Sequence, residues 1–149
     1  MEIPRNIDYF DSVHMVSKSY TKLMIPICEK WELTRNEVDV LLFLYNNPKY
    51  KRAADIVAHR GIAKSHVSLS VANLEKRGFL LRQFPPADRR TFHLVLTDQG
   101  LSVAQEAREL QEQFLESLYA GVTETEFAVW QGIAEKIQKN IQELDKSLG

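Results

Sequence analysis

The middle of the chain changes its hydrophobic period once, and this change limits the possible folds. Apolar residues have helical spacing in residues 53–60 and 64–77, and a glycine follows each segment. From residue 80 the period falls to two, in residues 80–84 and 91–96, which is typical of paired strands. Two short helices joined by a turn of about three residues are typical of a helix-turn-helix. The pattern predicts this unit with a β-hairpin directly behind it.

Longer helical patterns lie on both sides of this unit. The first is expected before residue 33, where Pro26 should bend or end it. A capping box from Thr34 to Glu37 predicts a second helix, which stops before Pro48 and is apolar on most of its faces. We therefore expect this second helix to be the most buried element.

Two more helices are predicted behind the hairpin. Thr97 is expected to cap the first, and Gly121 to break it. A second capping box, from Thr123 to Glu126, begins the last helix, which carries a long apolar stripe. The predicted fold is mainly α with a small β-hairpin wing, an α+β arrangement in a single domain over residues 1–149.

Composition excludes several classes of protein. Of the 149 residues, 44% are hydrophobic, which is too many for a disordered chain. The longest apolar runs are six residues, whereas a membrane helix needs about 20. No secretory signal is visible, and Cys28 is the only cysteine, so we expect a cytoplasmic protein.

Charge is segregated along the chain although the net charge is only −1. Residues 1–48 sum to −2, residues 49–100 to +6 and residues 101–149 to −5. A basic segment between acidic flanks suits a polyanion such as nucleic acid, although charged side chains can also simply solvate helix faces.

The helix predicted at 64–77 has the properties of one that reads the major groove of DNA. Val67, Val71 and Leu74 share a core-facing side, which leaves small and basic residues on the opposite side. The candidate DNA contacts on this helix are Lys64, Ser65, His66 and Ser68. Leu69 also points outward, where it could meet a thymine methyl group or pack against a neighbouring element.

The loop between the strands supplies the second group of candidates. Two prolines stiffen it before Asp88, Arg89 and Arg90, so it could present arginines to the minor groove. Asp88 would hold an arginine in place by a charge-assisted hydrogen bond. The alternative is a solvated surface turn.

These segments together resemble the MarR family of winged-helix regulators over essentially the whole chain. The specific strings are residues 74–80 (LEKRGFL) and 88–97 (DRRTFHLVLT) followed by Gly100, and residues 33–34 and 64–68 agree as well. The resemblance implies a homodimer that binds a near-palindromic duplex through residues 34–97, with residues 1–33 and 98–149 as dimerisation helices. It places Lys64, Ser65, His66 and Ser68 on the recognition helix, and it matches Asp88 and Arg90 to the wing Asp-x-Arg.

Two positions depart from the family pattern. Ala63 stands where a capping hydroxyl is common, and Leu69 stands where many members have arginine. They are the only support for a competing hypothesis, a protein-interaction or ligand-binding module without sequence-specific DNA binding.

The terminal helices carry longer apolar stripes than a winged domain could cover, so a homodimer is expected, although the terminal helices could also pack on one another. The family resemblance also implies a repressor and a small-molecule effector pocket. His14, Tyr20, Trp31 and Tyr45 lie near the helices that would line it, although such residues more often serve core or interface. Cys28 could sense peroxide only if it were exposed with a lowered pKa.

Neither a metal, a cofactor nor a catalytic residue is predicted. The four histidines lack a metal-ligand spacing, and neither a phosphate-binding glycine loop nor a hydrolase motif occurs in the sequence. We therefore do not expect an enzyme.

Overall fold

The core of the protein is built around α2 (Arg35–Asn46). The computed structural model describes Met1, residues 9–87 and residues 90–149. The Thr34 hydroxyl accepts from the amide of Glu37 at 3.2 Å, and the Glu37 carboxylate accepts from the amide of Thr34 at 2.9 Å. Every residue from Glu37 to Leu44 is buried. Both the predicted capping box and the prediction of the most buried element are confirmed.

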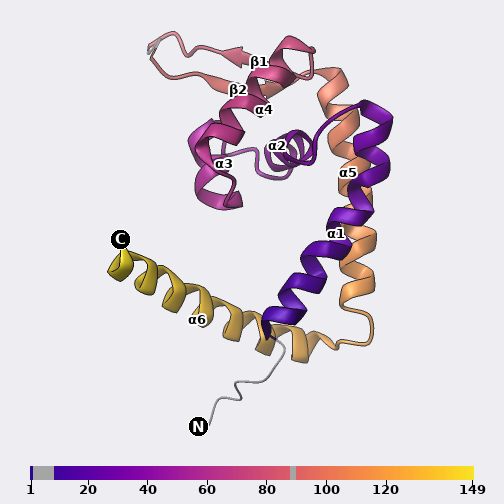
Figure 1. Cartoon of the computed structure of the whole chain (residues 1–149), viewed down its shortest axis with the longest axis vertical. Coiled ribbons are helices and arrows are strands. Elements are labelled where there is room, and N and C mark those ends of the chain that lie inside the picture. Colours follow the sequence, from indigo (N-terminus) through magenta and orange to yellow (C-terminus); the bar gives the residue numbers. More distant parts are fainter. Residues whose placement is uncertain (2–8, 88–89) are drawn as a thin grey trace. The chain divides into compact units, whose positions relative to one another are not determined.

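Four other helices pack around this centre. They are α1 (Tyr9–Trp31), α3 (Ala53–Arg60), α4 (Lys64–Lys76) and α5 (Asp98–Leu118). Helices α1 and α5 run side by side in opposite directions (Figure 1), since Tyr20 contacts Phe114 while Lys30 pairs with Glu106. Each of these helices contributes buried apolar side chains to the same core as α2: Met24, Ile27, Ile56, Val67, Val71, Leu74, Val103, Ala104 and Ala107.

Helix α1 continues through Pro26 to Trp31, so the proline does not end it. A proline inside a helix removes one backbone hydrogen bond. Met24, two residues before the proline, and Ile27, directly after it, are buried in the core. This packing offsets the lost hydrogen bond and keeps the last turns helical.

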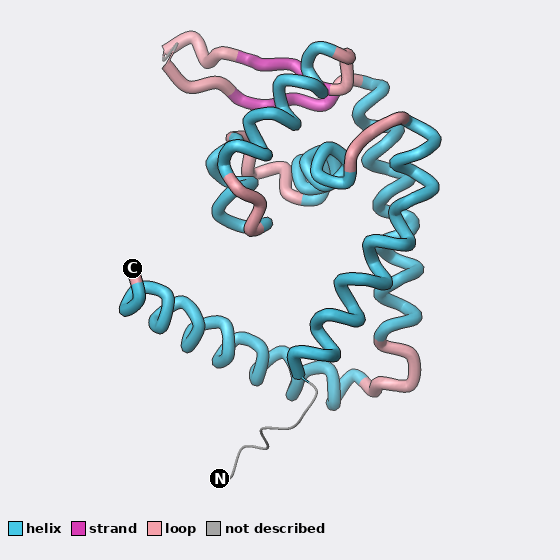
Figure 2. The backbone as a smooth tube through the Cα atoms, in the orientation of Figure 1, coloured by secondary structure: helices cyan, strands magenta, loops and turns pink. Residues whose placement is uncertain are grey.

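The wing is an antiparallel pair of strands, β1 (Leu80–Gln83) and β2 (His93–Leu96). Leu80 faces Leu96, and Gln83 faces His93, so each strand is shorter than predicted. The hairpin projects from the helical body (Figure 2). Its base is fixed because Leu80 and Leu94 are buried in the core.

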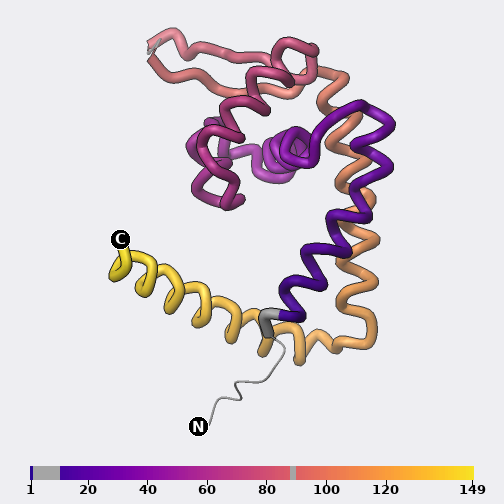
Figure 3. The backbone as a smooth tube through the Cα atoms, viewed as in Figure 1, coloured from indigo at the N-terminus to yellow at the C-terminus, as the bar shows by residue number. Residues whose placement is uncertain are grey.

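The chain divides into two compact units, Met1–Phe114 and Leu115–Gly149. The second unit holds the end of α5, a turn with Gly121 at φ +81°, and α6 (Glu124–Leu148), which comes last along the trace in Figure 3. Thr123 caps α6 with Glu126 as predicted. The assignment of the whole chain to one domain stays a prediction.

The apolar stripe of α6 is open to solvent in this chain. None of the residues of α6 is buried, and Trp130, Ile133 and Ile141 are each at least half exposed. Tyr119, Phe127 and Trp130 form an aromatic cluster with ring centroids 4.9 to 5.6 Å apart. In the described part of the chain, no helix combines the length and the apolar character that crossing a membrane requires.

Candidate nucleic-acid interface

Helix α4 has one buried side and one exposed side. Val67, Val71 and Leu74 are at most 2% exposed and hold the helix against α2. All four residues predicted to contact DNA on this helix, Lys64, Ser65, His66 and Ser68, are exposed near its N-terminus. The helix therefore presents small and basic side chains to solvent without disturbing the core.

The N-terminus of α4 can attract an anion. Ala63 occupies the N-cap position, and its methyl group makes no capping hydrogen bond, as its sequence predicts. The first amides of a helix point away from its body and carry a partial positive charge. Because Lys64 adds a full positive charge next to them, this end of the helix suits a phosphate group.

Leu69 lies at the centre of the exposed side of α4. Its side chain is 71% exposed, so the expectation that it packs against a neighbouring element is wrong. A rotation of about 100° per residue places Leu69 opposite Val67 and Val71, and close to Ser65 and Lys76 on the surface of the helix. It forms an apolar patch among polar neighbours.

Contacts from three other elements fix the position of α4. The side-chain amide of Asn73 donates to the buried Glu37 carboxylate, and Arg77 donates to the carbonyl of Trp31 at 2.9 Å. On the wing side, Arg82 pairs with Glu75 at 2.9 Å. These positioning residues were missed in the sequence because each partner lies on a different element.

The wing loop is described only in part. Asp88 and Arg89, both predicted to contact DNA, lie outside the described residues. Arg90 is exposed. Below the loop, the rings of Phe84 and Phe92 meet at 5.8 Å, and the Arg82 guanidinium lies 4.6 Å from the Phe92 ring centroid. This aromatic contact supports the base of the loop.

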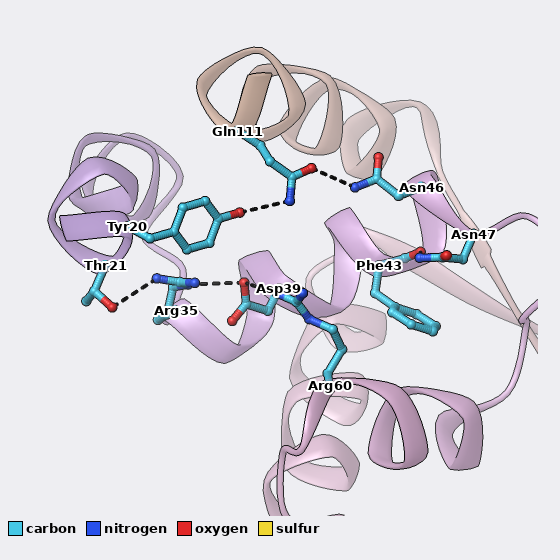
Figure 4. A network of polar contacts seen from close by, with 9 residues as sticks. All are labelled: Tyr20, Thr21, Arg35, Asp39, Phe43, Asn46, Asn47, Arg60 and Gln111. Atoms are coloured by element: carbon cyan, nitrogen blue, oxygen red, sulfur yellow. Dashed lines mark hydrogen bonds and ion pairs between the residues drawn. The ribbon is translucent and has the colours of Figure 1, made fainter. Parts of the chain in front are cut away.

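A polar network lies behind the interface and joins α1, α2, α3 and α5 (Figure 4). The Asp39 carboxylate, which is mostly buried, accepts from Arg35 at 3.1 Å and from Arg60 at 3.3 Å. In the same network, Gln111 of α5 donates to the hydroxyl of Tyr20 of α1 at 3.2 Å. Burial, together with Asp39, raises the pKa of Tyr20.

The other candidate residues have ordinary structural surroundings. Burial raises the pKa of the Cys28 thiol, which disfavours the reactive thiolate that peroxide sensing needs. Trp31 donates to Glu106 at 3.2 Å, while His14 and Tyr45 are exposed. Among the described residues, no group of three or more His, Cys, Asp or Glu side chains could hold a metal ion.

A comparison with protein families places this geometry in context. A model of the MarR family matches residues 31–91, which span α2, α3, α4, β1 and part of the wing loop. Over this segment the chain is similar to the MarR family of transcriptional regulators.

The curated relatives of this chain are distant in sequence. It is 22% identical over 113 residues to the HTH-type transcriptional regulator YdgJ of Bacillus subtilis, a match that covers 76% of this chain and 68% of YdgJ. It is 27% identical over 86 residues to the transcriptional repressor MprA of Escherichia coli K12, covering 58% of this chain and about half (49%) of MprA.

Solved structures share the MarR-family fold. A MarR-family regulator from Listeria monocytogenes in complex with a 26mer DNA has a TM-score of 0.80 at 17% identity, covering 92% of this chain and 91% of that one. BpsR of Bordetella bronchiseptica, whose DNA binding is regulated by 6-hydroxynicotinic acid, has a TM-score of 0.67 at 19% identity. The match covers 93% of this chain and 98% of BpsR. The predicted winged-helix fold is thereby confirmed.

Proposed function

We propose that the protein is a MarR-family regulator that binds double-stranded DNA in a sequence-specific manner. The observation that carries the proposal is the exposed side of α4, which combines small polar residues with a basic, anion-attracting N-terminus beside the wing. A helix with this surface fits the major groove of B-DNA. The regulator is proposed to act by binding alone, without catalysis, in the cytoplasm.

The contacts in the two grooves have different tasks. Ser65, His66 and Ser68 contact base edges, and Lys64 contacts guanine or a phosphate group. Arg90, together with Asp88 and Arg89, serves the minor groove, where the narrow electronegative floor attracts arginine. Substitutions on α4 therefore change which sequence is preferred, while substitutions in the wing weaken binding to every sequence.

The regulator is proposed to act as a homodimer through residues 1–33 and 98–149. The exposed stripe of α6, with Trp130, Ile133 and Ile141, is apolar surface that a second copy would remove from water. A two-fold dimer places two recognition helices roughly 34 Å apart and so selects a near-palindromic site. A monomeric mass by light scattering at micromolar concentration would contradict this part of the proposal.

We further propose that the dimer is a repressor released by a small molecule. Helix α4 is held by Glu37 of α2 and by the carbonyl of Trp31 at the end of α1, so a shift of α1 or α2 would move it. An effector must bind the released state more tightly than the DNA-bound state to have this effect. Effector screening by loss of DNA binding tests this step.

Selection of binding sites from random duplexes tests the central proposal. We expect an enriched near-palindromic sequence, weaker binding by Arg90→Ala to all duplexes, and a changed preference in Ser65→Ala. If no sequence is enriched even at low salt, the protein is the alternative, a winged-helix module that binds proteins or ligands. The apolar Leu69 on the exposed side of α4 is the observation that favours this alternative.

A further inference from the structure

A basic pocket lies beside the wing, away from the residues assigned to DNA contact above. It has a volume of about 560 Å³ and lies between the loop that joins α2 to α3 and strand β2. Its lining residues are Pro48, Lys49, Tyr50, Lys51, Arg52, Asp55 and His93. We name this site the loop pocket.

Positive charge dominates the loop pocket. Lys49, Lys51 and Arg52 are all exposed, and within residues 9–87 and 90–149 none of them forms an ion pair. Asp55 is the one acidic residue of the lining, and its carboxylate accepts from the backbone amide of Arg52 at 3.1 Å. Since Asp55 is held at the start of α3, the three cations remain available to an anion.

The loop pocket is also held in place before any ligand arrives. The amide of Leu94 donates to the carbonyl of Lys51 at 2.7 Å, which joins the loop to β2. Tyr50 is fixed on the other side by the ring of His59, with centroids 4.6 Å apart. Fixing the loop in advance lowers the entropy that is lost when a ligand binds.

We propose that the loop pocket binds a phosphate group of the DNA backbone, next to the bases that α4 contacts. The inference rests on the proposed function. One residue of its lining, His93, begins β2, the strand that leads away from the wing loop, and stands three residues after Arg90. Flexible lysines suit phosphates as point charges and carry no base specificity, so the pocket supplies affinity that does not depend on sequence.

The test compares two triple variants. In the first, called the pocket variant, Lys49, Lys51 and Arg52 are replaced by alanine. In the control, Lys49 and Lys51 become arginine and Arg52 becomes lysine, so the positive charges stay. Affinity for duplex DNA is measured against salt concentration, with circular dichroism and light scattering to establish folding and mass. Each lost phosphate contact lowers the slope of log K against log salt by about 0.9. Because one phosphate contact is lost, we expect the slope to fall by about 0.9 in the pocket variant and the affinity at 0.1 M salt to fall about tenfold.

Three results would overturn the inference. They are an unchanged slope in the pocket variant, an equal loss in the control, and a changed order of preference among operator variants. Inorganic phosphate could shift the NMR resonance of His93 although the pocket variant keeps the full salt dependence of DNA binding. The site would then bind a free anion instead of DNA. If the wild-type protein enriches no sequence, the proposed function fails, and the slopes on a duplex of random sequence still decide the role of the pocket.

Discussion

Replacing Gly100 by alanine should destabilise the protein strongly, because the backbone of another segment lies where the new methyl group must go. A Cβ atom built on Gly100 lies 1.9 Å from the carbonyl oxygen of Phe79, whereas ordinary contacts begin near 3.4 Å. Both partners are buried backbone, so a change of side-chain rotamer cannot relieve the clash. The start of α5 and the segment before β1 must separate by more than an ångström.

The size of the effect follows from what this separation breaks. Thr97 joins the two segments by donating through its amide to Phe79 at 3.2 Å and through its hydroxyl to Gly78 at 2.6 Å. Losing both hydrogen bonds costs about 2 kcal/mol, and overpacking adds about 1–3 kcal/mol. Alanine recovers about 1 kcal/mol as the better helix former. We expect a net loss of about 2–4 kcal/mol in the free energy of unfolding.

Thermal and urea unfolding of the purified protein at one fixed concentration measure this loss. For a chain of this length a change of 1 kcal/mol moves Tm by about 2–4 °C, so Gly100→Ala should lower Tm by about 5–15 °C. Ser102→Ala is the control, since it places alanine at an exposed position of the same helix and should change stability by less than about 0.5 kcal/mol. A Tm of Gly100→Ala within 2 °C of the wild type would refute the reasoning.

Three further predictions concern single residues. Replacing Asp39 by asparagine leaves Arg35 and Arg60 without their shared, mostly buried carboxylate. Urea unfolding should therefore show a loss of about 2 kcal/mol in the free energy of unfolding. An unchanged midpoint of the urea transition would contradict this. The exposed Leu69 can contact a thymine methyl group. Replacing that thymine by uracil should then weaken DNA binding by the wild-type protein about threefold to fivefold and leave binding by Leu69→Ala unchanged. Equal losses of affinity in both proteins at every thymine would exclude the contact. Because the pKa of Cys28 is raised, iodoacetamide should alkylate the folded protein more slowly than the urea-unfolded protein at pH 8, and the reverse order would show an activated thiol.

Local features of the structure were predicted well from the sequence. The capping boxes at Thr34 and Thr123 are formed by residues three positions apart, so the sequence contains both partners. Gly61 and Gly78 adopt positive φ at the ends of α3 and α4, where glycine is favoured. The exposed side of α4 followed from helical spacing alone, because its apolar residues must face the core.

Features that depend on distant partners required the tertiary structure. The contact of Arg77 with Trp31, the close approach of Gly100 to Phe79 and the loop pocket around His93 all join segments that are separate in the chain. The sequence by itself determined the order of the elements and the composition of each surface, because hydrophobic period and capping act within a few residues. Only the tertiary structure decided that α1 continues through Pro26 and that Leu69 stays exposed, because both depend on what the rest of the core covers.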